Sequence, residues 1–320
     1  KVFDLIRLEN LEVPHRRNGW IQALGTAKSI KGAKARNRQW KALGADVTML
    51  SSDHVAALTG SSAYRGGWLD RRAGTIDPLA FTLELARIAS ESGAKIVENC
   101  RVTGLRKQEG EWRVALQSGI EVRARSVVVA TNAYSDDLVP GLARTIVPLN
   151  SFQIATAPLP ERFDNIMPEE RCVSDSRRIL LYYRRTRDGR LVMGGRGQLG
   201  TPKRASGWKH LERAMRKIFP ELAGVPIEQR WYGKVAITPD HMPRIHEPEK
   251  GLVTAIGCNG RGIGLMTALG ERLALYARDG DPAALPLPIT PIRPIPLHGL
   301  RQVGTAAAIA LYRTLDALER

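Results

Sequence analysis

The sequence contains little cysteine, and the cysteines are far apart. Only Cys100, Cys172 and Cys258 occur among 320 residues. An odd number of widely spaced cysteines argues against a disulfide scaffold and favours a reducing compartment. We therefore expect a cytoplasmic protein.

Long apolar runs and metal-ligand spacings are also missing. No run approaches the ~20 apolar residues of a membrane-spanning helix, so no membrane partner is expected. Among the six histidines, only His241 and His246 lie near each other and near an acid, Asp240. This group is more typical of a solvated loop than of a metal site, and we expect no metal.

Acidic residues are outnumbered by basic ones, and the net charge is +16. A basic balance can indicate nucleic acid, a membrane surface or an anionic substrate. Here the arginines are scattered, without a basic run or interleaved aromatic residues. An arginine-rich proteome or a missing acidic segment explains the charge better than a nucleic-acid-binding face.

The most informative stretch is GLVTAIGCNGRGIGLMTALGERLALYA, residues 251–277. Its pattern predicts a buried strand over 252–256, a glycine loop, and a helix from about Leu265. Such a loop brings backbone N–H groups and the positive end of a helix dipole close to a ligand. A dinucleotide fingerprint is excluded, because G-x-G-x-x-G read from Gly260 would need glycine where Leu265 stands. A packed turn without a ligand remains the alternative.

The rest of the chain predicts two kinds of sheet. Residues 95–130 read as strands at 95–99, 101–107, 111–116, 121–124 and 126–130, with turns at Glu109-Gly110 and Ser118-Gly119. The last of them is continuously apolar, as expected for a parallel strand buried on both faces. Residues 146–230 predict antiparallel strands with a basic helix, and 300–318 an outer amphipathic helix.

Several segments together resemble a known family. GGWLDRRAGTIDPLAF, SVVVATNAYS, LYYRRTRDGRLVMGG, RWYGKVAITPDHMPRI and GCNGRGIGLMTALGE occur in this order along nearly the whole chain. They are similar to the D-amino-acid-oxidase-like (DAO) family of FAD-dependent oxidoreductases. VFDLIR, QIATAPL, CVSD and LALYARDG look most like the gamma-glutamylputrescine oxidases and their relatives within it.

The resemblance implies a mixed fold, α+β or α/β, with two domains. A two-dinucleotide-binding-type FAD domain would comprise residues 1–18, 75–145 and 231–320, and an antiparallel-sheet substrate domain 19–74 and 146–230. The chain begins inside what looks like a helix, at Lys1 and without an initiator methionine. We interpret it as a fragment or processed chain that lacks the N-terminal βαβ unit with G-x-G-x-x-G, and expect weak FAD affinity and little activity from it alone.

The implied activity is oxidation of an amine by noncovalently bound FAD, as in polyamine catabolism. Hydride would leave the carbon bearing the amine, the resulting imine would hydrolyse to an aldehyde, and oxygen or another acceptor would reoxidise the flavin. Relatives that bind an α-carboxylate do so through an Arg or a Lys at positions matching Val235 and Gly264, and the flavin-linking Cys near Gly233 is also missing. The substrate should therefore carry no α-carboxylate at the flavin.

Two other functions stay open. An amino-acid or sarcosine-type oxidase could use Lys234 or Arg184 to bind a carboxylate. A basic RNA-associated module is the alternative from another class, because related flavoprotein folds occur in RNA-modifying enzymes; nucleic acid is nevertheless not an expected partner.

Site residues carry over from the resemblance by position. Amides of the loop 259–263 would face the pyrimidine edge of the flavin, Val102 the adenine, and Thr131 and Asn132 the pyrophosphate or ribose. The cofactor set is Val102, Ala130, Thr131, Asn132, Gly257, Asn259, Gly260, Arg261, Gly262 and Ile263. For Arg261 the alternative is a surface arginine, and for the strand residues an ordinary structural role.

The residues predicted to meet the substrate lie on strands of the substrate domain and directly after it. Strand alternation puts Tyr182 and Arg184, the predicted catalytic residues, on one face and Tyr183 on the other. Tyr183, Trp231 and Lys234 are the predicted substrate-binding residues, with a core position as the alternative for Tyr183 and Trp231.

Overall fold

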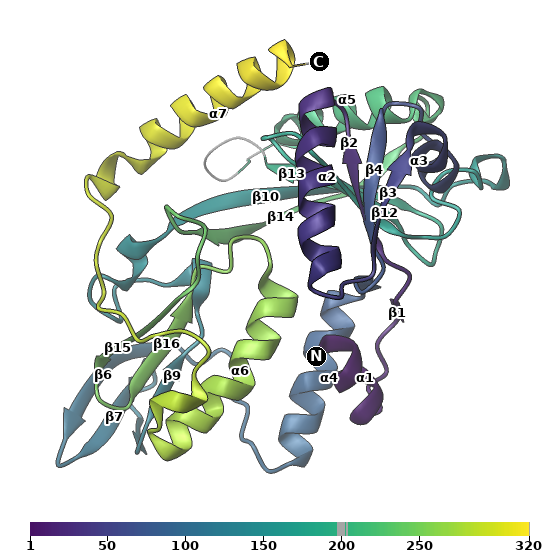
Figure 1. Ribbon diagram of the computed structural model, residues 1–320. Helices are drawn as coiled ribbons and strands as arrows, with labels where there is room; N and C mark the ends of the chain where they lie inside the picture. Colours follow the sequence, from purple (N-terminus) through teal and green to yellow (C-terminus); the bar gives the residue numbers. More distant parts are fainter. Residues whose placement is uncertain (197–201, 203, 320) are drawn as a thin grey trace. The chain divides into compact units, whose positions relative to one another are not determined.

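The computed structural model describes residues 1–196, 202 and 204–319, and the chain divides into two units (Figure 1). Unit 1 consists of Lys1–Val13, Pro78–Leu149 and Lys234–Arg301. Unit 2 consists of Pro14–Asp77, Asn150–Gly233 and Gln302–Arg320. Strands β10 (Val147–Thr156) and β14 (Ile227–Ile237) continue from one unit into the other.

The strands of unit 1 form two sheets, one ordered β6-β7-β8 and one ordered β15-β16-β9. Their bounds are β6 (Val102–Gln108), β7 (Glu111–Leu116), β8 (Glu121–Ala124), β9 (Val127–Val129), β15 (Arg244–Glu249) and β16 (Leu252–Ile256). The predicted hairpin turn between β6 and β7 is confirmed: Glu109 and Gly110 both have positive φ angles, 53° and 85°. The predicted parallel strand is confirmed as well, because β9 pairs in parallel with β16.

Two strand predictions in unit 1 are wrong. Residues 95–99 form no strand, and Ile96 and Val97 are 52% and 71% exposed. An extended segment needs a neighbour for its backbone groups, and no strand in the described part of the chain pairs with these residues. Val128 was expected to be buried on both faces of its strand but is 41% exposed. β9 is an edge strand among the described residues, so no strand on its outer side helps to cover the Val128 side chain.

Helices complete unit 1. They are α1 (Val2–Leu8), α4 (Pro78–Glu91) and α6 (Gly262–Asp279), with short 3-10 turns η1 (Asn132–Tyr134), η2 (Leu142–Thr145), η6 (Pro282–Ala284) and η7 (His298–Leu300). Leu269, Leu273 and Tyr276, spaced for one helix face, pack from α6 onto Val253 and Ala255 of β16. This contact fixes the strand–loop–helix element that the sequence singled out.

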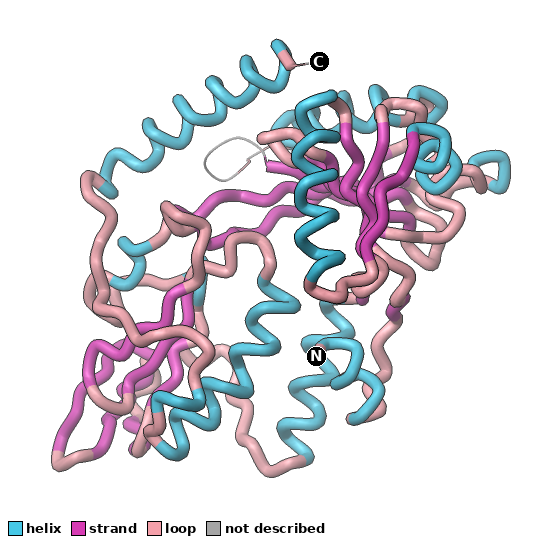
Figure 2. The backbone as a smooth tube through the Cα atoms, viewed as in Figure 1, coloured by secondary structure: helices cyan, strands magenta, loops and turns pink. Residues whose placement is uncertain are grey.

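Unit 2 is built on a sheet ordered β14-β10-β13-β12-β11-β2-β4-β3, whose strands lie side by side in Figure 2. Its other strands are β2 (Trp20–Leu24), β3 (Val47–Ser51), β4 (Gly66–Asp70), β11 (Cys172–Asp175), β12 (Leu181–Arg185) and β13 (Leu191–Arg196). Two short strands, β1 (His15–Arg16) and β5 (Thr75–Ile76), pair with each other in a separate sheet. The pairs β10–β13, β13–β12, β12–β11, β2–β4 and β4–β3 are antiparallel, and β11 pairs in parallel with β2. The predicted antiparallel sheet is confirmed.

The two faces of this sheet differ in polarity. Phe152, Leu181 and Tyr183 point to one face and pack against Leu211 and Met215 of α5. The other face, here called the polar face, carries Ser151, Gln153, Ser174, Tyr182 and Arg184, as the strand registers require. The helical elements of unit 2 are α2 (Ala27–Ala42), α3 (Ser52–Thr59), α5 (Lys209–Ile218), η3 (Glu161–Phe163), η4 (Ala205–Trp208) and η5 (Pro220–Leu222).

The last helix, α7 (Arg301–Leu318), has no buried residue in its described length. The sequence predicts that this helix belongs to the FAD-binding domain, and in the structure residues from Gln302 onward group with unit 2. Asp316 and Glu319 at its end pair with Arg178, and such long-range ion pairs give no sequence pattern. None of the described helices combines the length and apolar character needed to cross a bilayer.

Candidate functional site

The loop between β16 and α6 depends on residues that accept positive φ angles. All five residues of β16 are buried, and the chain then turns through Gly257 (φ 86°), Asn259 (φ 52°) and Gly260 (φ 85°). A β-carbon at Gly257 would lie 2.5 Å from Thr238 Cγ2, so only glycine fits there. The helix begins at Gly262, three residues before the predicted start, because the tight turn ends sooner than the apolar periodicity suggests.

Hydrogen bonds join the ends of two parallel strands beside this loop. Thr254 Oγ1 donates to Val129 O at 2.7 Å, and Gly257 N–H donates to Asn132 Oδ1 at 3.1 Å. Ala130 and Thr131 follow β9 directly. The structure thus brings the predicted 130–132 and 257–263 segments together at the carboxyl ends of β9 and β16, where α/β sheets bind ligands.

Asn259 holds the loop through its side chain. Its Nδ2 donates to Gly257 O at 2.6 Å, and its Oδ1 accepts the Thr238 N–H at 2.9 Å. The backbone N–H of Asn259 already donates to Ala236 O, and that of Arg261 to Cys258 O, both at 2.9 Å. These two predicted cofactor residues therefore shape the loop, and their amides are engaged within the protein.

The start of α6 lies at the surface, where Gly260, Ile263 and Gly264 are exposed. Arg261 occupies the N-cap position of α6 without a side-chain cap, and the first turn contains no acid. First-turn amides such as those of Gly262 and Ile263 have no partner within the helix. Added β-carbons at Gly260 and Gly264 would meet nothing within 4 Å. The arrangement offers free donors and a positive dipole end to an electron-rich group.

Tyr134 is a residue near this loop that the sequence analysis missed. Its Oη accepts the backbone N–H of Lys234 at 3.1 Å, and Lys234 Nζ lies 5.3 Å from the centre of its ring. Tyr134 is 62% exposed, just after Asn132 on η1. The sequence signal for Tyr134 was its position as the aromatic residue of SVVVATNAYS. Val102, by contrast, begins β6 and belongs to the other sheet of unit 1.

Tyr182 and Arg184 lie on the polar face of unit 2. The Tyr182 hydroxyl hydrogen-bonds to Ser151 Oγ, and its ring covers Gly194, where a β-carbon would come within 2.1 Å of a ring carbon. Burial raises the pKa of Tyr182, so the hydroxyl stays protonated. Arg184 Nη1 donates to Ile76 O at 2.9 Å.

The other two aromatic residues divide between the faces. Tyr183 is 3% exposed, packs edge-on against Phe219 and bonds to the Tyr64 hydroxyl at 3.2 Å, which matches the core alternative. Trp231 is 41% exposed. Its neighbour Tyr232 stacks on Phe152 in the core, so alternation turns Trp231 to the opposite side.

Among the described residues, no group of three or more His, Cys, Asp or Glu is arranged to hold a metal ion. In unit 1 the predicted site residues offer backbone amides, a guanidinium and an ammonium group, and in unit 2 they offer aromatic rings, a hydroxyl and a guanidinium. Such groups bind and orient a ligand and need a cofactor for redox chemistry.

Comparison with protein families and curated proteins gives consistent matches. A family model described as "DAO: FAD dependent oxidoreductase" matches residues 2–275. The "Probable oxidoreductase OrdL" of Rhizobium meliloti (strain 1021) is 32% identical over 231 residues, 72% of this chain and 53% of that protein. The "Gamma-glutamylputrescine oxidoreductase" of Escherichia coli (strain K12) is 28% identical, covering 86% of this chain and 65% of that protein. The chain thus spans about half to two thirds of these relatives.

A solved structure shares the fold. Glycine oxidase from Geobacillus kaustophilus superposes with a TM-score of 0.74 at 20% identity, covering 87% of this chain and 75% of that one. At this identity the likeness concerns the fold alone. The predicted mixed α/β fold with an antiparallel sheet is confirmed.

Proposed function

Since this chain belongs to the DAO family of FAD-dependent oxidoreductases, we propose that it supports the oxidation of a gamma-glutamylputrescine-like amine by noncovalently bound FAD. The observation that carries the proposal is the uncapped start of α6, with its open glycines and its link to the end of β9. Oxygen or another acceptor would take the electrons. The reaction would belong to polyamine catabolism in the cytoplasm.

The described residues fit the electron-rich edge of a flavin. The amides of Gly260, Gly262 and Ile263 would hold that edge, while Asn132 and Asn259 keep the loop in shape. When bound, FAD supplies a hydride acceptor whose pyrimidine end becomes negative. The positive end of an 18-residue helix favours that charge, and its first turn contains no acid to oppose it.

The substrate end of the proposal rests on the polar face of unit 2. Tyr182 and Arg184 offer a neutral hydroxyl and a fixed cation, and Trp231 an exposed ring. The family resemblance matches Val235 and Gly264 to the positions where relatives with α-carboxylate substrates carry a cation. A buried carboxylate without a cation is unfavourable, so this supports an amine whose reacting carbon carries no carboxylate.

An absorption spectrum of the full-length protein tests the proposal. We expect flavin bands that bleach anaerobically with gamma-glutamylputrescine and remain with sarcosine or glycine. Bleaching by sarcosine or glycine alone would favour the amino-acid oxidase alternative, with Lys234 or Arg184 binding the carboxylate. A protein purified without flavin that also fails to bind added FAD would contradict the assignment. RNA binding that falls steeply with salt would support the third alternative.

Tyr182→Phe should lower kcat/KM for the amine about tenfold, because the ring stays and one hydroxyl contact is lost. Flavin content should not change. Tyr183→Phe is the matched control, since it removes a hydroxyl from the next residue on the core face. That variant should lose about 1 kcal/mol of stability with kcat/KM unchanged. Steady-state kinetics and thermal denaturation measure both; equal kinetic effects would contradict a specific role for Tyr182.

A further inference from the structure

Polar residues other than the predicted site residues line a cavity in unit 2. The cavity has a volume of about 650 Å³ and lies where β2 and β11 end and α2 begins. This size suits a small molecule. Its charged lining consists of Lys28, Arg65, Arg177, Arg178, Lys217, Asp175, Asp316 and Glu319. The cations outnumber the carboxylates by five to three, and two of the three carboxylates come from the end of α7.

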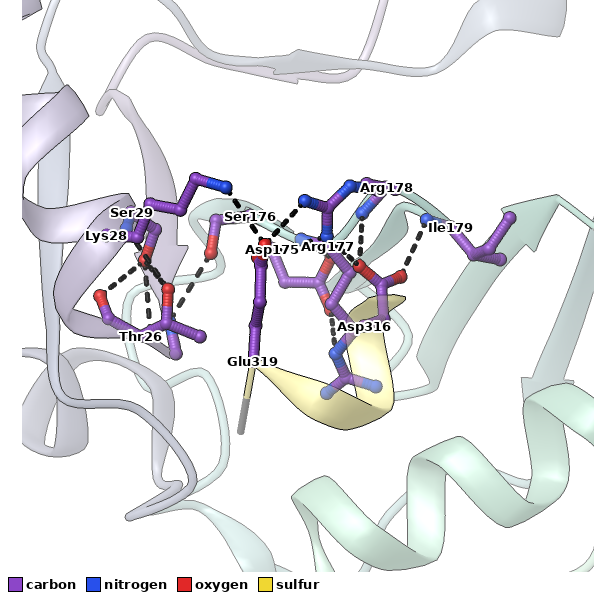
Figure 3. A network of polar contacts seen from close by, with 11 residues as sticks. Thr26, Lys28, Ser29, Asp175, Ser176, Arg177, Arg178, Ile179, Asp316 and Glu319 are labelled. Carbon is purple, nitrogen blue, oxygen red and sulfur yellow. Dashed lines mark hydrogen bonds and ion pairs between the residues drawn. The ribbon is translucent and has the colours of Figure 1, made fainter. Parts of the chain in front are cut away.

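The end of α7 occupies a ready-made oxyanion site (Figure 3). Asp316 accepts the backbone N–H groups of Arg178 and Ile179, each at 3.1 Å, and the Arg178 guanidinium at 3.2 Å. Two adjacent amides with a guanidinium form the arrangement that proteins use to bind carboxylate and phosphate. The donors belong to the β11–β12 connection, a segment separate from α7.

Glu319 fills the neighbouring position. Its carboxylate accepts Arg178 Nη2 at 2.7 Å and Lys28 Nζ at 2.9 Å. Both hydrogen bonds together hold the pKa of Glu319 at about 2, so it is ionised at neutral pH. Glu319 and Asp316 therefore present two negative groups to the cavity, as a small dianion would.

Two cations of the cavity are left over. Arg65 and Lys217 form no ion pair within the described part of the chain, although both line the cavity. Asp175, 2% exposed, forms part of the wall and is paired with Arg177 at 2.9 Å. The cavity thus keeps an excess of positive charge even when α7 is docked, and it can attract a further anion.

The attachment of α7 itself is weak. No residue of the helix is buried, and Val303, Leu311 and Leu318 are 68%, 56% and 76% exposed. Partly exposed ion pairs contribute little to stability and are screened by salt. A free ligand that offers the same oxygens to the same donors can therefore compete with the helix end.

We propose that this cavity binds a small molecule carrying phosphate or carboxylate groups, in competition with Asp316 and Glu319 of α7. The ligand would use the amides of Arg178 and Ile179 and the side chains of Lys28, Arg178 and Lys217. Its binding would release the end of α7, and docking of α7 would lower the affinity for the ligand. No bond is made or broken in this exchange.

Titration calorimetry of the full-length protein with inorganic phosphate and with citrate, at ionic strength held constant with chloride, tests the proposal. We expect saturable binding of at least one of these anions. Glu319→Gln should tighten it roughly threefold to tenfold by weakening the competitor, and Lys217→Gln should weaken it roughly tenfold. The preferred anion distinguishes phosphate from carboxylate recognition.

Matched controls come from an exposed ion pair of unit 1. Glu121→Gln and Arg106→Gln remove one partner each from a pair at 2.7 Å and should leave anion binding unchanged. Absence of saturable binding to both the parent protein and the Glu319→Gln variant would overturn the proposal. So would an effect of Lys217→Gln no larger than that of Arg106→Gln.

Limited proteolysis tests the competition independently of affinity. Arg313 lies in α7, three residues before Asp316, and offers a trypsin site. The anion that binds should speed cleavage at Arg313 relative to chloride at equal ionic strength, because the docked helix end is released. Binding that leaves this cleavage rate unchanged would overturn the competition between ligand and helix.

Discussion

Replacing Asn259 by alanine is expected to lower the affinity of the full-length protein for FAD by roughly 100-fold and to destabilise unit 1 by about 3 kcal/mol. The Asn259 side chain links the glycine loop to the segment that follows β14. It donates to Gly257 O at 2.6 Å and accepts the Thr238 N–H at 2.9 Å. Thr238 is 2% exposed, so its N–H would lose a partner in a place that water reaches poorly. Asn259 has a φ angle of 52°, a left-handed conformation that is unfavourable for alanine.

The loss of FAD affinity follows from a smaller population of the loop conformation that binds the flavin. If the bound loop conformation becomes less stable by about 3 kcal/mol, the affinity of any ligand that requires it falls by about two powers of ten. Fluorescence titration with FAD measures the affinity, and chemical denaturation measures the stability. Hydrogen exchange of residues 256–265 would locate the change.

Two further substitutions separate the hydrogen bonds from the backbone strain. Asn259→Gly removes both hydrogen bonds but accepts the positive φ angle, so it should recover about 1 kcal/mol relative to alanine. Asn259→Asp keeps the acceptor for the Thr238 N–H and loses the donor to Gly257 O. FAD affinity that stays at the parent level in all three variants would show that this loop does not form the flavin site.

The glycine stretch shows what the sequence could predict. The strand, the loop and the helix of residues 252–279 were expected from apolar periodicity and glycine spacing alone, because each is a local pattern. The use of the Asn259 and Arg261 amides was not expected. The Asn259 N–H donates to Ala236 O on β14, a partner that only the tertiary fold supplies, and the Arg261 N–H closes a local turn onto Cys258 O. The direction in which an amide points is a property of the folded loop.

The strands predicted from apolar runs were right only where a neighbour exists. Val127–Val129 pairs with β16, whereas residues 95–99, in which only Ile96 and Val97 are apolar, remain outside any strand. β-propensity describes suitability for a sheet, and the pairing partner decides the outcome. The docking of α7 likewise depends on ion pairs with Arg178 and Lys28, which a local sequence pattern does not encode.

Asp175 gives the second large expected effect, a stability that falls as the pH rises. Burial raises the pKa of Asp175 to about 6, against the opposing charge of Arg177 and the N–H groups of Leu181 and Arg177. Its Oδ1 accepts both amides, while Oδ2 lies 2.9 Å from Arg177 Nε without good hydrogen-bond geometry. The ionised form is therefore incompletely compensated in the folded state.

The sign of the effect follows from proton binding. Between the unfolded pKa of about 4 and the folded pKa of about 6, the folded chain holds a proton that the unfolded chain has lost. The stabilisation is complete below the lower value and disappears as the pH rises through the upper one. From pH 4.5 to pH 8 the parent protein should thus lose about 2 kcal/mol through this group.

Asp175→Asn should remove this dependence, because asparagine keeps an oxygen for the Arg177 and Leu181 amides and cannot ionise. The difference in unfolding free energy between variant and parent should therefore grow in favour of the variant by about 2 kcal/mol from pH 4.5 to pH 8. Asp188→Asn is the control: hydrogen bonds from Thr186 and then Arg190 lower the pKa of that exposed carboxyl, so any pH effect should have the opposite sign. Urea denaturation at several pH values measures both. Parallel stability curves for the parent and the Asp175→Asn variant would mean that Arg177 fully compensates the buried charge.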